Sequence, residues 1–359
     1  MSMMIAGLGT ALPPHQISQA DAAQIVKQYS CVTAAQERLF ETLYRRAGVS
    51  GRGSVVLDNS EGPLEIRQSF YTSSSSPTTL DRMRKYEAES SPLAVAASRA
   101  ALRDAGVEPD RVTHLITVSC SGFCAPGFDI GLVKQLPLPS RVARTHIGFM
   151  GCHGALNGLR VARAFVEADP SACVLLCALE LCSLHQQYGW DADKVVASAL
   201  FADGAAAVVA LAPEAARTKR YEVVSSGSVV IEDSEDAMSW RIGNHGFEMT
   251  LSPRVPELIS QHLRPWLEHW LASFHLDLAA IRSWAIHPGG PRILSAVIEA
   301  AGLREEAIET SQQVLADHGN MSSPTILFIL DRLSRSGHCG PCLALAFGPG
   351  LTAEAALLI

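Results

Sequence analysis

The sequence has 359 residues, 48% of them hydrophobic and 18% charged, which suffices for two ordinary domains or one large layered α/β unit. A net charge of −7 without a long basic run argues against nucleic acid as a partner. No apolar stretch approaches the ~20 residues that span a bilayer, and residues 1–9 are typical of a strand rather than a secretory leader. We therefore expect a cytoplasmic protein without a membrane span.

Strand-like apolar runs alternate with helical patterns up to residue 213. Ser18, with an acid three residues later, is typical of a helix start, and Pro92 after Ser91 predicts the start of a helix that Gly106 ends. The Ser-, Thr-, Gly- and Pro-rich residues 58–81 are predicted to be irregular. Further helices are predicted over 34–46 and 153–168, and strands over 3–9, 113–119, 144–150, 172–179 and 205–211.

The pattern begins again after Pro213. Strands are predicted over 221–231, 283–286, 343–347 and 354–359, and helices over 253–274, 290–301, 305–317 and 322–336. Ser322 or Ser323 is expected to cap the last helix. Strand–helix alternation predicts parallel sheets covered on both faces. We expect an α/β fold of two successive halves, residues 1–213 and 214–359.

Nine cysteines, an odd number without a secretion signal, argue against a disulfide framework. Cys339 and Cys342 form the one CxxC motif, which lacks the second ligand pair of a structural zinc site. We therefore expect no bound metal. Cys173 and Cys177 lie in an apolar run and are predicted to be core residues.

Cys152 is the best candidate nucleophile, because it lies between an apolar strand and a helix rich in small residues. The helix N-terminus would favour its thiolate, and free N–H groups there could donate to an oxyanion. The alternative is an inert buried cysteine. His287 follows the short strand 283–286 and precedes Pro-Gly-Gly-Pro, at a strand end of the kind that binds ligands in α/β proteins.

Asn320 lies on a predicted turn before a helix, where its amide could donate to a developing negative charge. Taken singly, His287 is an ordinary polar residue as readily as a catalyst, and Asn320 is more readily an ordinary turn residue. Together with Cys152 they supply a thiolate–imidazolium nucleophile and two donors for an enolate or tetrahedral oxyanion. That set suits an enzyme that takes an acyl group from a thioester and condenses it with a decarboxylated malonyl unit.

Three motifs, at 148–152, 287–291 and 319–323, resemble those of type III polyketide synthases, the chalcone and stilbene synthase superfamily. Residues 180–183, 200–206 and 347–352 support this resemblance. It implies a thiolase-like αβαβα fold of two similar halves and an acyltransferase that acts as a homodimer without an acyl carrier protein. It also implies acyl-CoA starters, malonyl-CoA extenders and no further cofactor.

The resemblance also implies roles for single residues. Cys152 would take the starter, while His287 would hold the thiolate and stabilise the enolate with Asn320. Phe201 would be the gatekeeper, and Met249 occupies the position of a second one. Further cavity residues would be Cys120, Cys182, His185, Trp240, Ser322, Gly348 and Pro349, and Arg46 would bind CoA.

The cavity cysteines Cys120 and Cys182 resemble those of bacterial alkylresorcinol and alkylpyrone synthases, and a wall with fewer hydroxyls suits an alkyl chain. Several alternatives stay open. A ketoacyl synthase III-like enzyme would perform one condensation with the same three residues, and a thiolase would need a second reactive cysteine near the C-terminus. The alternative that is not an enzyme is a non-catalytic binding protein with the thiolase fold.

Overall fold

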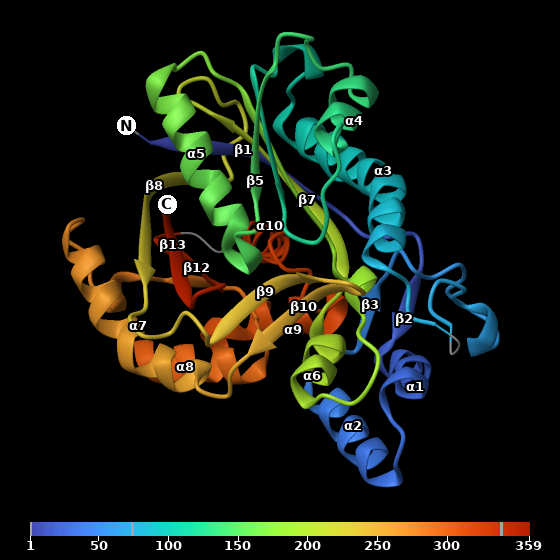
Figure 1. The fold of residues 1–359 in the computed structure, drawn as a ribbon. Helices are drawn as coiled ribbons and strands as arrows, with labels where there is room; N and C mark the ends of the chain where they lie inside the picture. Colours follow the sequence, from blue (N-terminus) through green and yellow to red (C-terminus); the bar gives the residue numbers. More distant parts are fainter. Residues whose placement is uncertain (1, 73–74, 338–339) are drawn as a thin grey trace.

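The main sheet of this computed structural model, which describes residues 2–72, 75–337 and 340–359, has nine strands (Figure 1). Their order across the sheet is β11, β12, β13, β8, β1, β7, β6, β4 and β5. Their bounds are β1 Met3–Ala11, β4 His114–Ser119, β5 Ala143–Gly148, β6 Val174–Leu181, β7 Asp203–Leu211, β8 Tyr221–Val230, β11 Ser283–Ile286, β12 Cys342–Gly348 and β13 Thr352–Leu358.

The two halves of the sheet repeat one pattern of strand directions. In the order β1, β7, β6, β4 the first two pairings are antiparallel and the third is parallel, and β8, β13, β12, β11 show the same sequence. An antiparallel pairing of β1 with β8 joins the halves. The expectation of parallel sheets was therefore wrong for five of the eight strand pairings, because alternation of strands and helices along the chain does not fix the direction of β7 and β13. The boundary near residue 213 stays a prediction.

Helices cover both outer faces of this sheet and fill the space between its halves. Helices α3 (Thr79–Ala105) and α4 (Phe128–Gln135) pack on the first half, and α7 (Val255–Ala272) and α8 (Pro291–Ala301) on the second. Between the halves, α5 (Gly154–Ala168) and α10 (Thr325–Arg335) share one apolar core with strands from both. These layers are the expected αβαβα arrangement.

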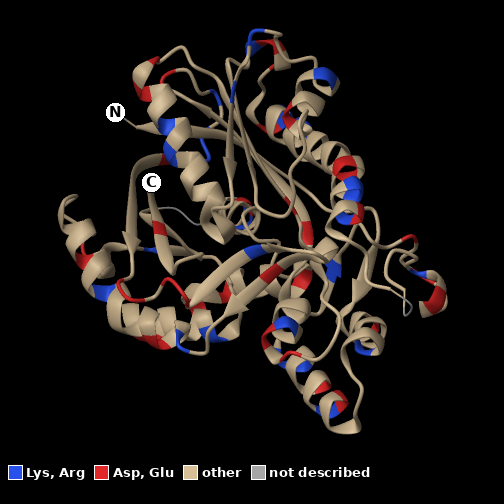
Figure 2. Ribbon diagram, in the orientation of Figure 1, with Lys and Arg blue, Asp and Glu red and all other residues tan. Residues whose placement is uncertain are grey.

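Helices α1 (Gln19–Ser30) and α2 (Ala34–Arg46) and strand β10 (Gly246–Leu251) lie beside α6 (Ala192–Leu200) (Figure 1). The structure has no membrane-spanning candidate among the helices it describes. Lys and Arg alternate with acidic residues on the outer helices (Figure 2). The remaining helices and strands are α1 Gln19–Ser30, α2 Ala34–Arg46, α9 Glu309–His318, β2 Gln16–Ser18, β3 Gly51–Gly53, β9 Met238–Gly243 and β10 Gly246–Leu251, and 3₁₀ turns lie at Leu64–Ile66, Pro109–Arg111, Gly151–His153, Cys182–His185, Leu278–Ala280 and Glu305–Ile308.

Two predicted helix starts were wrong. Helix α3 begins at Thr79, where Thr78 and Asp81 form a reciprocal capping box, so Pro92 lies inside the helix instead of opening it. Helix α10 begins at Thr325 without a side-chain cap, because Ser323 donates to Glu180 instead and Ser322 adopts a left-handed backbone. Ser18, in contrast, accepts the expected hydrogen bond from the backbone N–H of Asp21.

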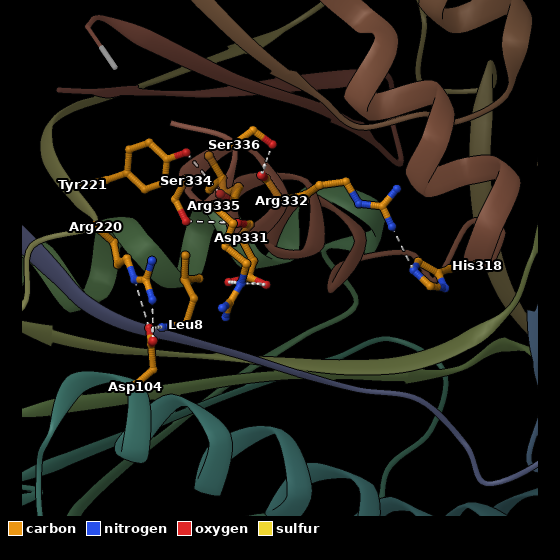
Figure 3. A network of polar contacts seen from close by, with 11 residues as sticks. Leu8, Asp104, Arg220, Tyr221, His318, Asp331, Arg332, Ser334, Arg335 and Ser336 are labelled. Atoms are coloured by element: carbon orange, nitrogen blue, oxygen red, sulfur yellow. Dashed lines mark hydrogen bonds and ion pairs between the residues drawn. The ribbon is translucent and has the colours of Figure 1, made fainter. Parts of the chain in front are cut away.

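A polar network ties the two halves together where β1 meets β8 (Figure 3). The Asp104 carboxylate, at the end of α3, accepts from the Leu8 backbone N–H at 3.0 Å and from Arg220 Nε at 3.1 Å. The Tyr221 hydroxyl donates to the Leu330 carbonyl oxygen in α10 at 3.0 Å. Elements of both halves are thus fixed at the seam of the sheet.

Candidate active site

Cys152 lies in a 3₁₀ turn, Gly151–His153, directly before α5. Gly151 has φ +67°, and a β-carbon there would lie 2.4 Å from Pro349 Cδ, so the turn requires glycine. Gly348 packs against the His153 ring in the same way. Gly348 and Pro349 therefore pack against the turn that carries the Cys152 thiol.

His287 and Asn320 reach the same place from the second half. His287 follows β11, and its backbone N–H donates to Leu345 at 2.8 Å. Asn320 lies between α9 and α10, and its backbone N–H and carbonyl bond to Leu200 and Ala202. Both side chains are 1% exposed. They line one cavity of about 20 Å³ with Cys152, and its other walls are Ala197, Leu200, Phe201, Met238, Met249, Leu251, Gly289, Ile293 and Phe347.

The local hydrogen bonds orient both side chains as donors. His287 Nε2 lies 3.1 Å from the Ser322 carbonyl oxygen, which can only accept, so a neutral ring carries its proton on Nε2. Asn320 Oδ1 accepts from the Ser322 N–H at 2.8 Å, which leaves the amide NH₂ as the free group. Ser322, with φ +56°, thus positions both candidate donors through its backbone.

Burial favours the neutral forms of Cys152 and His287. It raises the pKa of the Cys152 thiol to about 12, against hydrogen bonds from Ser322 and Asn320 that lower it. Burial also lowers the pKa of His287 to about 4. Each group alone is therefore neutral near pH 7, and the expected thiolate–imidazolium pair requires a proton transfer that charges both groups together.

The two central helices bring their N-terminal ends together at this cavity. Cys152 precedes α5, and Asn320 precedes α10 by a few residues. A β-carbon built on Gly154 would lie 3.5 Å from Ser323 Cβ, so the two starts are in contact. Both helix dipoles therefore favour negative charge that develops at the cavity.

Phe201 and Met249 separate this cavity from a second one of about 120 Å³, because they line both. Cys182, His185 and Trp240 line the second cavity. The Trp240 indole N–H donates to the Cys120 carbonyl oxygen at 2.7 Å, and its ring contacts those of His185 and Phe201. Trp240 is therefore fixed beside Phe201 in the wall of the second cavity.

Cys120 and Arg46 line neither cavity. The Cys120 thiol is buried beside Glu180 Oε1, at 3.2 Å, and Ser322 Oγ, at 3.6 Å. Arg46 is exposed at the end of α2. Arg52, a neighbouring cation in the sequence, is buried and donates to the backbone carbonyls of Ser198, Ala199 and Phe201, so it serves the fold.

Glu180 is a buried acid that the sequence marks in two ways, as a charge at the end of an apolar strand and as the first residue of the supporting motif 180–183. Its carboxyl accepts from the backbone N–H groups of Cys120 and Ser121 and from Ser323 Oγ at 2.7 Å. Burial raises its pKa. Glu180 thereby links the loop after β4 to the start of α10.

Cys339, half of the CxxC motif, lies outside the described residues, and Cys342 is a free buried thiol. No group of three or more potential metal ligands occurs within residues 2–72, 75–337 and 340–359.

Comparison with known proteins identifies the family. The model for the N-terminal domain of chalcone and stilbene synthases matches residues 1–213, and that for the C-terminal domain matches residues 222–359. The chain is 32% identical to the alpha-pyrone synthesis polyketide synthase-like Pks18 of Mycobacterium tuberculosis, over 99% of this chain and 90% of that protein. It is 31% identical to 1,3,6,8-tetrahydroxynaphthalene synthase of Streptomyces peucetius subsp. caesius, over 99% and 92%.

Solved structures agree with this assignment. PKS-I from the brown alga Ectocarpus siliculosus superposes with a TM-score of 0.92 at 28% identity, over 99% of this chain and 98% of that one. The fungal type III polyketide synthase ORAS superposes with a TM-score of 0.85 at 27% identity, over 100% and 99%. The chain belongs to the chalcone and stilbene synthase family, the type III polyketide synthases, and is an acyltransferase with the thiolase-like fold.

Proposed function

We propose that this enzyme loads an acyl group from CoA onto Cys152, extends it with malonyl-CoA and cyclises the product to an alkylresorcinol, an alkylpyrone or a related aromatic compound. One observation carries the proposal: Cys152, His287 and Asn320, from three segments far apart in the sequence, line one buried cavity. Its other walls are mostly apolar, so charges that develop there interact strongly with the few polar groups present.

Loading begins with attack of Cys152 Sγ on the thioester carbonyl carbon of the starter. The thiol proton passes to His287, and the tetrahedral oxyanion collapses with loss of the CoA thiolate, which takes up a proton. The N-terminal ends of α5 and α10 favour the negative charge of this intermediate. The acyl group is then bound to Cys152 as a thioester.

Extension begins with loss of CO₂ from malonyl-CoA, and the electron pair of the broken bond forms an enolate. The enolate oxygen accepts a hydrogen bond from the Asn320 amide, whose NH₂ group is free because the amide oxygen is held by the Ser322 N–H, and the His287 ring lies in the same cavity. The enolate carbon attacks the carbonyl of the Cys152 thioester and releases the thiolate. Each cycle lengthens the chain by two carbons, without an acyl carrier protein.

The walls beyond the gatekeeper support an alkyl starter. Cys182 and Trp240 offer no free hydroxyl, and burial lowers the pKa of His185 to about 3, so its ring is neutral. The relative Pks18 is named for alpha-pyrone synthesis, in keeping with lactone closure as one outcome. We also propose that Arg46 binds CoA. Two residues after it, Gly48 lies beside Pro291 at the start of α8, and Gly289, two residues before Pro291, lines the cavity of Cys152.

We also propose a homodimer. Strand β5 is an edge of the nine-stranded sheet and its residues are largely exposed, whereas the four residues of the other edge, β11, are buried. Phe123 and Phe149, close to this edge, are 52% and 39% exposed. An uncovered edge strand flanked by aromatic side chains suits pairing with a second copy.

Mass spectrometry of products from a panel of acyl-CoA starters with malonyl-CoA tests the proposed function. We expect products that contain two or more malonyl-derived units, and none from Cys152→Ala. Cys173→Ala, which removes a thiol buried in the core instead, is the matched control and should keep activity. Products with a single extension would support a ketoacyl synthase III-like enzyme. Malonyl-CoA left untouched by the purified wild-type protein would contradict the proposal altogether.

A further inference from the structure

His153 is a buried titratable residue that the proposed reaction does not use. It follows Cys152 directly, as the last residue of the 3₁₀ turn, and it is 2% exposed and does not line the cavity of the thiol. Burial lowers the pKa of His153, so its ring is neutral near pH 7. A buried imidazole needs hydrogen-bond partners for both ring nitrogens, whereas an apolar side chain would need none. The reason for a histidine at this position therefore lies in its contacts.

Both ring nitrogens of His153 have a side-chain partner. Nδ1 lies 2.7 Å from Asn157 Oδ1, one helical turn further along α5. An amide oxygen can only accept, so Nδ1 carries the ring proton and donates it. Nε2 lies 2.6 Å from Oγ1 of Thr352, the first residue of β13, and accepts from this hydroxyl. The ring thus joins the start of α5, in the first half of the fold, to β13 in the second.

The turn between β12 and β13, residues 348–352, contacts both neighbours of Cys152. Its first two residues pack against the His153 ring and against Gly151, and a β-carbon built on Gly348 would lie 2.3 Å from His153 Cδ2. The hydrogen bond to Nε2 comes from the last residue of the same turn. Apolar contacts limit how closely the two segments approach, whereas a hydrogen bond is directional and also limits sliding and rotation.

Strand β12 also holds His287. The backbone N–H of His287 donates to the Leu345 carbonyl oxygen at 2.8 Å, directly after the parallel pairing of β11 with β12. Gly348 lies three residues further along the same strand. The strand that holds the proton acceptor is therefore continuous with the turn that His153 binds. A shift of α5 relative to this strand would change the separation between the Cys152 thiol and the His287 ring.

We propose that His153 is a positioning residue, which fixes the Cys152 thiol relative to the His287 ring by joining α5 to β13. This rests on the loading step of the proposed function, in which the thiol proton passes to His287. Proton transfer requires donor and acceptor within hydrogen-bond reach, so small shifts between them slow it. His153 should therefore affect starter loading, which needs the thiol. It should not affect decarboxylation of malonyl-CoA, whose enolate is bound by Asn320 in the second half.

The first test removes the hydroxyl that binds His153. Thr352→Val keeps the size of the side chain and leaves Nε2 without its donor, whereas Thr352→Ser keeps the hydroxyl and is the matched control. Single-turnover acylation of Cys152 by a radioactive acyl-CoA measures loading. We expect Thr352→Val to lower its maximal rate at least about fivefold, with the half-saturating starter concentration and malonyl-CoA decarboxylation within about twofold of the wild type. Thr352→Ser should stay within about twofold in all three measurements. Equal losses of loading and decarboxylation, or no loss of loading, would overturn the inference.

The second test asks whether Thr352 acts through His153. His153→Leu removes both hydrogen bonds of the ring and should slow loading at least as much as Thr352→Val, with His262→Leu, at an exposed position of α7, as its control. In the His153→Leu background, Thr352→Val should change loading by less than about twofold. Losses that multiply in the double variant would show that the two residues act separately and would overturn the inference. If His153→Leu does not fold, the two Thr352 variants decide alone.

The same measurements distinguish this inference from the proposed function. Acylation of Cys152 that depends on the Thr352 hydroxyl, in a protein that releases no polyketide, would support the positioning role and refute the proposed function. Polyketide formation with acylation unchanged in Thr352→Val would support the proposed function and refute the positioning role. A wild-type protein that is not acylated at Cys152 would refute both.

Discussion

The buried thiol of Cys152 and the buried imidazole of His287 must become charged together before the thiol can attack. Each is neutral alone, since burial raises the pKa of the thiol to about 12 and lowers that of the imidazole to about 4. Proton transfer between them converts two neutral groups into one ion pair, whose attraction offsets part of the cost of desolvating both charges. Reactivity of Cys152 therefore depends on His287 more than on the helix N-terminus alone.

His287→Gln tests this dependence. Without the imidazole, only the hydrogen bonds from Ser322 and Asn320 oppose the effect of burial on the thiol pKa, so the pH at which iodoacetamide labels Cys152 at half its maximal rate should rise by at least about one unit, or about 1.4 kcal/mol. Site-resolved mass spectrometry measures the rate at each pH. Cys31, a half-buried thiol outside the site, serves as the internal reference and should keep its profile. An unchanged profile for Cys152 would show that His287 does not take the proton.

Asn320 should act in decarboxylation rather than in loading. Asn320→Asp keeps the acceptor for the Ser322 N–H and removes the amide donors, while Asn320→Ala removes both. We expect malonyl-CoA decarboxylation to fall by about 10²–10³ in both variants, and labelling of Cys152 by a radioactive starter to fall far less. Asn244→Ala, on an exposed turn, controls for loss of an amide. Full decarboxylation by Asn320→Asp would exclude the amide as the enolate donor.

Among single helices and strands, the sequence predicted correctly those whose ends are set by local caps and breaks. The helix over 34–46 and the strand over 283–286 have the predicted bounds, because their patterns end at clear caps and breaks. The start of helix α3 was predicted wrongly, because the capping box at Thr78 begins the helix and Pro92 lies inside it. Helix α6 and the β9–β10 hairpin were not predicted, since they are short and their stability comes from packing against each other.

The seam between β1 and β8 yields an element-scale prediction. Burial alone would raise the pKa of Asp104, but hydrogen bonds from Arg220 and Leu8 outweigh it and lower the pKa. A lowered pKa stabilises the fold above the unfolded value of about 3.9, and this contribution is lost as the pH falls through the folded value. Asp104→Asn should therefore cost ~1–3 kcal/mol at pH 7 and less below pH ~4, measured by urea unfolding. Exposed Asp110→Asn is the control, and an equal cost at both pH values would contradict the ionic account.

At the scale of the whole molecule, the candidate site joins segments that the sequence places far apart. Motif residues in both halves predicted that Cys152, His287 and Asn320 would share one site, and the structure places them around one cavity. The second cavity could not be predicted, because α1, the segment before α3, α6 and the β9–β10 hairpin each contribute a few apolar residues without a motif. Their meeting depends on tertiary packing that no local pattern encodes.

The exposed edge strand β5 leads to a prediction about whether the enzyme is a monomer or a dimer. Phe123 and Phe149 lie 6.1 Å apart between ring centroids beside this edge. If two copies pair here, Phe123→Asp places a charge in the interface and should weaken the dimer by about 2 kcal/mol or more, roughly thirtyfold in Kd. Sedimentation velocity of the wild type and the variant measures this shift. Ile242→Asp, which is 55% exposed on β9, is the matched control and should leave the dimer intact. A wild type that stays monomeric at micromolar concentration would refute the homodimer, and equal weakening by both variants would place the interface elsewhere.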